Sequence, residues 1–350
     1  MILFKKRKQI CVIMTVVLSL TILIYAQQQA VEKKQFSDYS EMRSYVGDLY
    51  RQKNYKEAAE ILAGALEQFP DHVHANSYNL ALMLVHLDEF GKCVEVLNNA
   101  LDQGAWFGKY DFLSEFWNPV KEMENYQAFS LRNEELRKIA GKSAKPELFV
   151  YTPENFTPDK KFPLFIALHG GGGNVEEFKN NWFSEKMRSD FIAAFPQSSQ
   201  LITMNGYNWT EDIEVSKKEI HEAYLKVIKE YPVDIDRVVI GGFSSGGVAA
   251  LEVTLDNTFP VRGFVVLCPA KPDGFSGEKI VAAKNRGIRG IILTTEMDNR
   301  LDVQKEMAEI MNTTGFPHQF FITPNIGHWF PDDMDKKIDE AIEFILSKNM

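Results

Sequence analysis

Cysteine is scarce in this 350-residue sequence, which has three, Cys11, Cys93 and Cys268. No pair of them has the spacing of a metal-binding motif, and they are too far apart to indicate a disulfide framework. We therefore predict no metal site and no cofactor, and we expect Cys93 and Cys268 to be small, buried, apolar residues.

Positive charge is also in short supply, since the net charge is −9 at pH 7. The first 26 residues hold four basic residues and no acidic one, so the rest of the chain carries −13. Binding to a phosphate backbone needs patches of lysine and arginine. This balance argues against nucleic acid as a partner.

Long apolar runs are absent except at residues 10–25, a stretch of sixteen residues. It is shorter than the about 20 residues of a membrane-spanning helix, and it follows "KKRK" and precedes "QQQ". This is the pattern of a signal peptide over residues 1–26, which predicts export to the periplasm or the medium. Because Ile24 occupies a position where cleavage prefers a small residue, an uncleaved membrane anchor through residues 10–25 is the alternative.

Residues 27–145 are predicted to form a helical domain with an internal repeat. Two segments align at an offset of 35 residues, which places Tyr55 on Phe90, Ala58 on Cys93, Leu62 on Leu97 and Leu66 on Leu101. The ladder resembles one to two tetratricopeptide repeats, whose period is 34 residues, and such repeats often bind a protein partner. A generic helical hairpin is the alternative. Residues 105–145 are expected to form a helical bridge.

Residues 146–350 have a different texture, in which short apolar runs end at turn residues and alternate with stretches of helical period. The runs are "PELFVYTP", "PLFIALHG", "FIAAFP", "RVVIGGFS", "GFVVLCP", "GIILTTE" and "HQFFITP". Alternation of this kind predicts an α/β fold with a mostly parallel sheet covered on both faces. Ligands of such sheets bind beyond the carboxyl ends of the strands.

The segment from Gly242 to Gly246 matches the pattern G-x-S-x-G, and it follows an apolar strand and opens a helix. That context is the one required of a nucleophile elbow, a turn so tight that glycine is needed on both sides of the serine. The pattern selects Ser244, since Ser245 has Phe243 two residues before it.

Two further strand ends carry candidate residues. Four consecutive glycines, Gly170–Gly173, leave backbone N–H groups open to an oxyanion, and His169 is expected to order this loop. Asp298 follows one of the last strands and His328 follows the next, which gives the chain order serine, acid, histidine of α/β-hydrolases. Glu296 and Asp302 are the alternatives to Asp298.

Together, "VDIDRVVIGGFSSGGVAALEV", "PLFIALHGGGGN" and "NIGHWFP" resemble the α/β-hydrolase superfamily. They are most similar to phospholipase/carboxylesterase and feruloyl-esterase/polyhydroxybutyrate-depolymerase-like esterases. The resemblance covers about residues 146–350 and implies Ser244 as nucleophile, His328 as base and Asp298 as acid. It also implies an oxyanion hole made by the N–H groups of Ser245 and a residue near Gly171.

The predicted activity is hydrolysis of carboxylic esters, small or polymer-linked, through an acyl-enzyme. A serine peptidase or thioesterase on the same scaffold, and a non-catalytic partner-binding protein, are the alternatives. Four aromatic residues are candidates for substrate binding: Tyr207, Trp209, Trp182 and Trp329.

Overall fold

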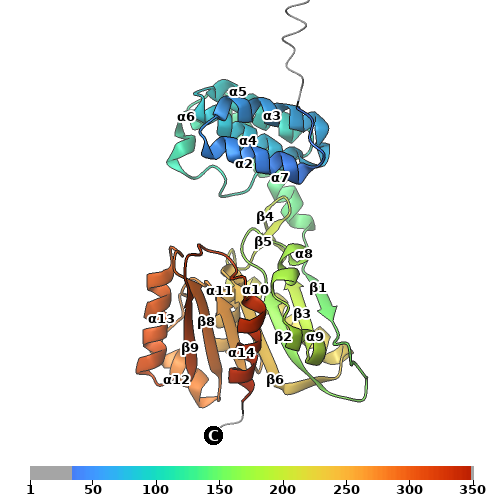
Figure 1. Cartoon of the computed structure of the whole chain (residues 1–350), viewed down its shortest axis with the longest axis vertical. Helices are drawn as coiled ribbons and strands as arrows, with labels where there is room; N and C mark the ends of the chain where they lie inside the picture. Colours follow the sequence, from blue (N-terminus) through green and yellow to red (C-terminus); the bar gives the residue numbers. More distant parts are fainter. Residues whose placement is uncertain (1–33, 348–350) are drawn as a thin grey trace, which may run out of the picture. The chain divides into compact units, whose positions relative to one another are not determined.

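A computed structural model describes residues 34–347, which divide into two compact units (Figure 1). The first unit comprises residues 34–105 and Leu113–Asn133, and the second comprises Trp106–Phe112 and residues 134–347. The predicted signal peptide lies outside the described residues. In residues 34–347 no helix combines the length and the apolar character that crossing a membrane requires.

The first unit is helical, as the sequence predicts. Its helices are α2 (Tyr39–Arg51), α3 (Tyr55–Gln68), α4 (Val73–His86), α5 (Phe90–Asp102) and α6 (Asn118–Lys121). Helix α2 begins at Asp38, whose side chain accepts a hydrogen bond from the backbone N–H of Glu41, which satisfies one of the free donors of a helix start.

The 35-residue repeat is visible in the backbone of this unit. The turns before α3 and α5 contain Lys53 and Asp88, 35 residues apart, which have φ angles of 59° and 57°. The aligned residues Leu62 and Leu97 are both buried, one in each of these helices. The two helical pairs thus share a turn conformation and a buried leucine at this offset, and the tetratricopeptide-like repeat stays a prediction.

Two segments that the sequence places in the helical domain group partly with the second unit. Helix α7 (Tyr126–Ser143) contributes its residues from Glu134 onward. The segment Trp106–Phe112 also groups there, and its Lys109 ammonium and Tyr110 hydroxyl both bind the Glu211 carboxylate. The segment Trp106–Phe112, called the inserted segment below, thus belongs to the second unit although the residues on both sides of it belong to the first. Composition alone does not reveal this.

The second unit is built on a seven-stranded sheet of order β1-β3-β2-β6-β7-β8-β9. Strand β1 pairs antiparallel with β3, and the other neighbours are parallel. The strands are β1 (Glu147–Tyr151), β2 (Phe162–Leu168), β3 (Ile192–Gln197), β6 (Val233–Phe243), β7 (Gly263–Leu267), β8 (Arg289–Thr295) and β9 (His318–Thr323). All seven apolar runs are strands, so the predicted mostly parallel α/β fold is confirmed.

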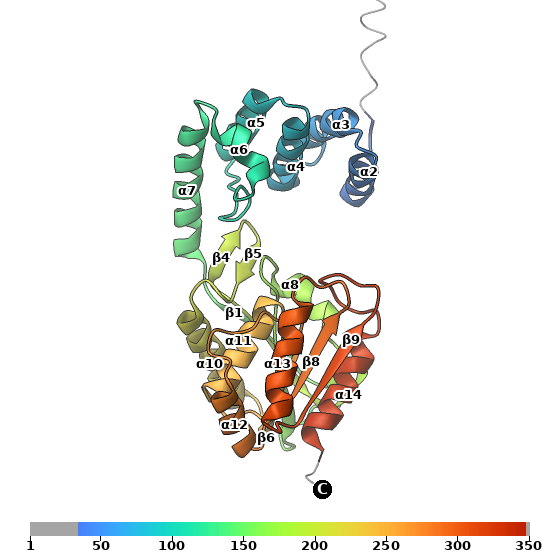
Figure 2. The same ribbon diagram turned by 90° about the vertical axis from the view of Figure 1, so that its left-hand side faces the viewer.

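Helices cover both faces of the sheet (Figures 1 and 2). One face packs on α10 (Ile213–Glu230), α11 (Ser245–Leu255), α12 (Gly277–Asn285) and α13 (Leu301–Thr313). The other packs on α8 (Val175–Phe178), α9 (Glu185–Asp190) and α14 (Met334–Leu346). Along β2 the side chains alternate between the two cores, with Ile166 in one and Phe165 in the other, which explains why the strand reads as a continuous apolar run.

A two-stranded hairpin, β4 (Gln200–Thr203) and β5 (Gly206–Asn208), follows β3. Strand β5 contacts the glycine loop that follows β2, because the backbone groups of Tyr207 exchange hydrogen bonds with Gly172 and Gly173. The loop that ends β2 is therefore held from outside the main sheet.

Candidate active site

Ser244 occupies a tight turn between β6 and α11. Its backbone has φ 53° and ψ −115°, a region that residues with a side chain rarely adopt. The backbone N–H of Ser244 donates to the carbonyl oxygen of Leu267 at 2.8 Å, which fixes the turn to the end of β7. The strained residue is thus held at the carboxyl edge of the sheet.

The glycines on either side of this turn have no room for a side chain. A Cβ atom built at Gly242 would lie 2.3 Å from the carbonyl carbon of Gly246, and one built at Gly246 would lie 2.4 Å from the carbonyl oxygens of Leu168 and His169. Backbone atoms cannot retreat as a side chain can. The steric reason for the G-x-S-x-G pattern is therefore present at both positions.

Three side chains meet at this edge in one hydrogen-bonded chain. His328 Nε2 lies 2.9 Å from Ser244 Oγ, and His328 Nδ1 lies 2.9 Å from Asp298 Oδ2. Asp298 comes from the turn after β8 and His328 from the loop after β9, which places both beside the end of β6. With Nδ1–H donating to the carboxylate, Nε2 is left as the acceptor for the Ser244 hydroxyl.

The Asp298 carboxylate is buried yet stays ionised. Burial by itself raises the pKa of Asp298, but hydrogen bonds from the Arg300 backbone N–H and the His328 ring outweigh it and lower the pKa below its ordinary value. Gln304 Nε2 also donates to Oδ2, at 3.3 Å. A buried carboxylate with several donors is suited to hold an imidazole in one tautomer.

The two alternative acids lie away from His328. Glu296 accepts a hydrogen bond from the Asn325 backbone, and the Asp302 side chain is 97% exposed and paired with Lys305. The geometry therefore brings Asp298, and neither alternative, to the histidine.

The predicted oxyanion donors, Gly171 and Ser245, are neighbours in space. A Cβ atom at Gly171 would lie 3.2 Å from Ser245 Oγ. Within residues 34–347, the backbone N–H groups of Gly171 and Ser245 donate to no protein acceptor. An oxyanion hole needs free N–H groups near the nucleophile, so Gly171 and Ser245 stay the predicted donors.

His169 links the glycine loop to the segment that follows β3. It is completely buried; its Nδ1 lies 2.8 Å from the carbonyl oxygen of Gly170 and its Nε2 3.3 Å from the backbone N–H of Ser198. Nδ1 therefore donates and Nε2 accepts, which requires a neutral ring. Burial lowers the pKa of His169 to about 4, and the bond to Gly170 opposes this only in part.

Acid should consequently destabilise the second unit through His169. Between about pH 6.5 and pH 4 the unfolded chain binds a proton at this ring and the folded chain does not, so stability falls as pH falls through this window, by about 3 kcal/mol in total. In urea titrations followed by tryptophan fluorescence, we expect His169→Asn to have a shallower loss of unfolding free energy between pH 7 and pH 4 than the wild type. Equal slopes in the two proteins would contradict this assignment.

A mostly apolar pocket of about 220 Å³ opens beside the hydrogen-bonded side chains of Ser244, His328 and Asp298. It is lined by Gly170–Gly173, Asn174, Glu177, Phe178, Asn181, Phe243, Trp329 and Phe330. Trp329, one of the predicted substrate-binding residues, lines it and is 60% exposed. Tyr207 lines a separate pocket on the β5 side of the glycine loop.

Two of the predicted substrate-binding residues do not face a free surface. Trp182 and Trp209 are completely buried, Trp182 against Phe178 and Phe330, and Trp209 against His169. A substrate cannot reach either ring in this structure, so their prediction as binding residues is corrected to a role in the two cores. Proximity in sequence to the site could not distinguish core from pocket.

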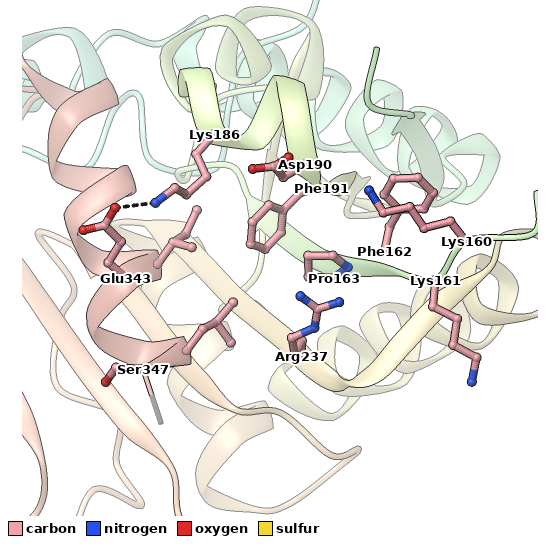
Figure 3. Close-up of a pocket in the computed structure, with 12 residues that line it drawn as sticks. Lys160, Lys161, Phe162, Pro163, Lys186, Asp190, Phe191, Arg237, Glu343 and Ser347 are labelled. Atoms are coloured by element: carbon pink, nitrogen blue, oxygen red, sulfur yellow. Dashed lines mark hydrogen bonds and ion pairs between the residues drawn. The ribbon is translucent and has the colours of Figure 1, made fainter. Parts of the chain in front are cut away.

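A larger pocket, of about 340 Å³, lies at the amino end of the strands (Figure 3). It is lined by charged side chains that include Lys160, Arg237 and the ion pair of Lys186 with Glu343. None of the predicted site residues lines it. The smaller pocket is the one beside Ser244.

Arg300 is a site residue that the sequence analysis missed. Its Nη1 lies 3.1 Å from Ser244 Oγ and 3.5 Å from His328 Nε2, and its backbone N–H donates to Asp298 Oδ1 at 2.9 Å. The only sequence signal is its position two residues after the acid, in a turn that a parallel sheet directs toward the site.

The two described cysteines are buried and unpaired, as predicted. Burial raises the pKa of both the Cys93 and the Cys268 thiol to about 12. Cys268 follows β7 and its Sγ lies 3.7 Å from Thr295 Oγ1, close to the Asp298 carboxylate. A protonated thiol there adds no second negative charge beside the Asp298 carboxylate.

The sheet order, the serine turn and the loop positions of Asp298 and His328 define an α/β-hydrolase fold. An uncharacterized protein from Bacillus cereus ATCC 10987 has a similar fold. The two structures superpose with a TM-score of 0.50 at 24% identity, over 88% of this chain and 98% of the other.

Other comparisons are more distant. Esterase PE8 superposes with a TM-score of 0.48 at 15% identity, over 58% of this chain and 100% of that one. A segment of 104 residues, 29% of this chain, is 27% identical to the bifunctional acetylxylan esterase/xylanase XynS20E of Neocallimastix patriciarum. The match spans 15% of the length of that curated relative. No family model matches the chain.

Proposed function

We propose that this protein hydrolyses carboxylic esters through an acyl-enzyme on Ser244. The observation that carries the proposal is the pair of 2.9 Å hydrogen bonds that link Ser244 to His328 and His328 to Asp298. The free N–H groups of Gly171 and Ser245 and the adjacent apolar pocket support it.

In the proposed reaction, Ser244 Oγ attacks the ester carbonyl carbon while its proton passes to His328 Nε2. The carbonyl oxygen becomes an oxyanion that accepts hydrogen bonds from the N–H groups of Gly171 and Ser245. When the carbon–oxygen bond breaks, the leaving alkoxide takes the proton from Nε2. Water, deprotonated by the same nitrogen, then attacks the acyl-enzyme and releases the acid.

Asp298 has a supporting role in both steps. Its carboxylate keeps the proton of the imidazole on Nδ1 and stabilises the imidazolium that forms when Nε2 takes the proton of Ser244. The low pKa of Asp298 supports this role, because the carboxylate stays charged wherever the histidine can act as a base.

The experiment that tests the proposal is a substrate panel with the purified chain. Aryl acetates and butyrates, acetylated xylo-oligosaccharides, acyl-thioesters and peptide anilides represent the reactions that a serine hydrolase of this fold can perform. We expect measurable kcat/KM values for the oxygen esters that exceed those for the anilides by several orders of magnitude. Turnover of anilides alone would indicate a peptidase, and turnover of thioesters alone would indicate a thioesterase; either result contradicts the proposal.

The acetylxylan esterase activity in the name of the curated relative supports the choice of oxygen esters within the panel. Two further expectations from the sequence stay predictions, namely export directed by residues 1–26 and binding of a protein partner by the helical unit. A groove of about 280 Å³ among α2, α3 and α4 of that unit is where such a partner is expected to bind.

A further inference from the structure

Arg300 brings a positive charge to the nucleophile. Its Nη1 is 3.1 Å from Ser244 Oγ, which is within hydrogen-bond distance, and the side chain is half-buried. The proposed ester hydrolysis gives it no role, since the base, the acid and the oxyanion donors are other groups.

No carboxylate neutralises this arginine within residues 34–347. The neighbouring cations differ from it in this respect, since Lys271 pairs with Glu306 and Lys305 pairs with Asp302. The Asp298 carboxylate accepts from the Arg300 backbone and not from its side chain. Partial burial of an unpaired cation is unfavourable, so the site is incomplete in charge until an anion enters.

The Arg300 guanidinium also has hydrogen-bond donors that are not used. It has five N–H donors, and in the described part of the chain its side-chain hydrogen bonds all come from Nη1 and go to neutral acceptors, Ser244 Oγ and His328 Nε2. A carboxylate matches the planar fork of arginine with two parallel hydrogen bonds. A phosphate dianion fits less well, because within residues 34–347 no second cation contacts Ser244 or His328.

The position of Arg300 relative to the oxyanion donors decides which part of a substrate it can reach. In the sheet order β2-β6-β7-β8, Ser244 follows β6, the glycine loop follows β2 on one side, and Arg300 follows β8 on the other side. An ester whose carbonyl oxygen points to Gly171 and Ser245 therefore turns another of its substituents toward Arg300.

We propose that Arg300 determines specificity by binding a carboxylate carried by the ester substrate, close to the scissile bond. The inference rests on the proposed ester hydrolysis at Ser244 and narrows its substrate class to anionic esters. The carboxylate can belong to the acyl group or to the alcohol, and both sources present the same chemistry to the guanidinium.

Two matched substrate pairs test this. In the first, the charge is on the acyl side: the 4-nitrophenyl monoester of succinic acid and the same ester with the free acid replaced by an amide. In the second, it is on the alcohol side: 3-acetoxybenzoate and 3-acetoxybenzamide. We expect the wild type to prefer the acid over the amide by roughly ten- to a hundredfold in kcat/KM in one of the pairs, the effect of a charge-assisted hydrogen bond.

The variant Arg300→Gln keeps a planar donor and loses the charge, and it should bring this ratio to about one, chiefly through KM for the acid. Arg300→Lys should retain part of the preference. The control Lys305→Gln removes a nearby exposed positive charge that does not touch Ser244, and it should keep the wild-type ratio. A ratio near one in both pairs for the wild type, or an unchanged ratio in Arg300→Gln, would overturn the inference.

Failure of the proposed function has a different signature. If the proposed function is wrong, the wild type hydrolyses none of the four esters, or Ser244→Ala hydrolyses them at the wild-type rate. If only the inference is wrong, all four are hydrolysed in a Ser244-dependent way without preference for the acids. An equal loss on acids and amides in Arg300→Gln would also overturn it, because a donor to the reacting atoms affects every ester.

Discussion

Replacement of Ser244 by alanine is expected to lower kcat for the best ester substrate by roughly 10⁵- to 10⁶-fold, the loss seen when a serine nucleophile is removed. The reason is that Ser244 Oγ forms the acyl-enzyme in the proposed mechanism and is the only hydroxyl hydrogen-bonded to His328 Nε2 in residues 34–347. Alanine can occupy the same strained backbone as serine, so the fold should be retained. Steady-state kinetics and circular dichroism of the variant measure the two effects.

A fluorophosphonate probe gives an independent measurement. The wild type should be labelled at Ser244, and the Ser244→Ala variant should not be labelled. Ser189→Ala serves as the control, because it removes a hydroxyl in α9, which covers one face of the sheet and does not reach the site. This variant should be labelled like the wild type. Labelling that survives in Ser244→Ala would place the nucleophile elsewhere.

Asp298→Asn should lower kcat by roughly 10⁴-fold with little change in folding, as expected when the acid of such a triad becomes an amide. The amide N–H₂ donates to His328 Nδ1, so the ring proton moves to Nε2 and the ring can no longer accept the proton of Ser244. The amide oxygen still accepts from the Arg300 backbone N–H, a bond that the Asp298 carboxylate makes at 2.9 Å. Turnover of aryl esters and thermal unfolding check both parts.

Asp302→Asn is the matched control for this variant, because Asp302 is four residues further along and its side chain is exposed. It should retain wild-type turnover. If Asp302→Asn or Glu296→Gln lost activity while Asp298→Asn retained it, the proposed role of Asp298 would be wrong.

The centre of the sheet was predictable because β2, β3, β7 and β8 are buried on both faces and therefore read as uninterrupted apolar runs. Strand β2 is one such run. Strand β7, which begins at Gly263, and strand β8, which ends at Thr295, are two others. The elbow was predictable for a steric reason, since glycine is the only residue that fits at positions 242 and 246. The convergence of Asp298 and His328 follows from the rule that parallel strands end at one edge.

Other features depend on contacts that sequence does not encode locally. The Arg300 side chain folds back over Ser244, whereas its neighbour Lys305 points to solvent, and residue type cannot distinguish the two. Trp182 and Trp329 look equivalent as aromatic residues near glycine-rich turns, yet one is completely buried and the other is 60% exposed. The inserted segment Trp106–Phe112 is located by its bonds to Glu211, about 100 positions away in sequence.

The burial of Cys93 and Cys268 bears on the redox chemistry of the protein. Burial raises the pKa of both thiols to about 12, so in the folded chain at pH 7 the thiolate, which is the species that exchanges with disulfides, is scarce. Oxidised glutathione and disulfide-forming enzymes should therefore find no reactive sulfur in residues 34–347. In its folded state this part of the chain should therefore keep both thiols free when its surroundings change from reducing to oxidising.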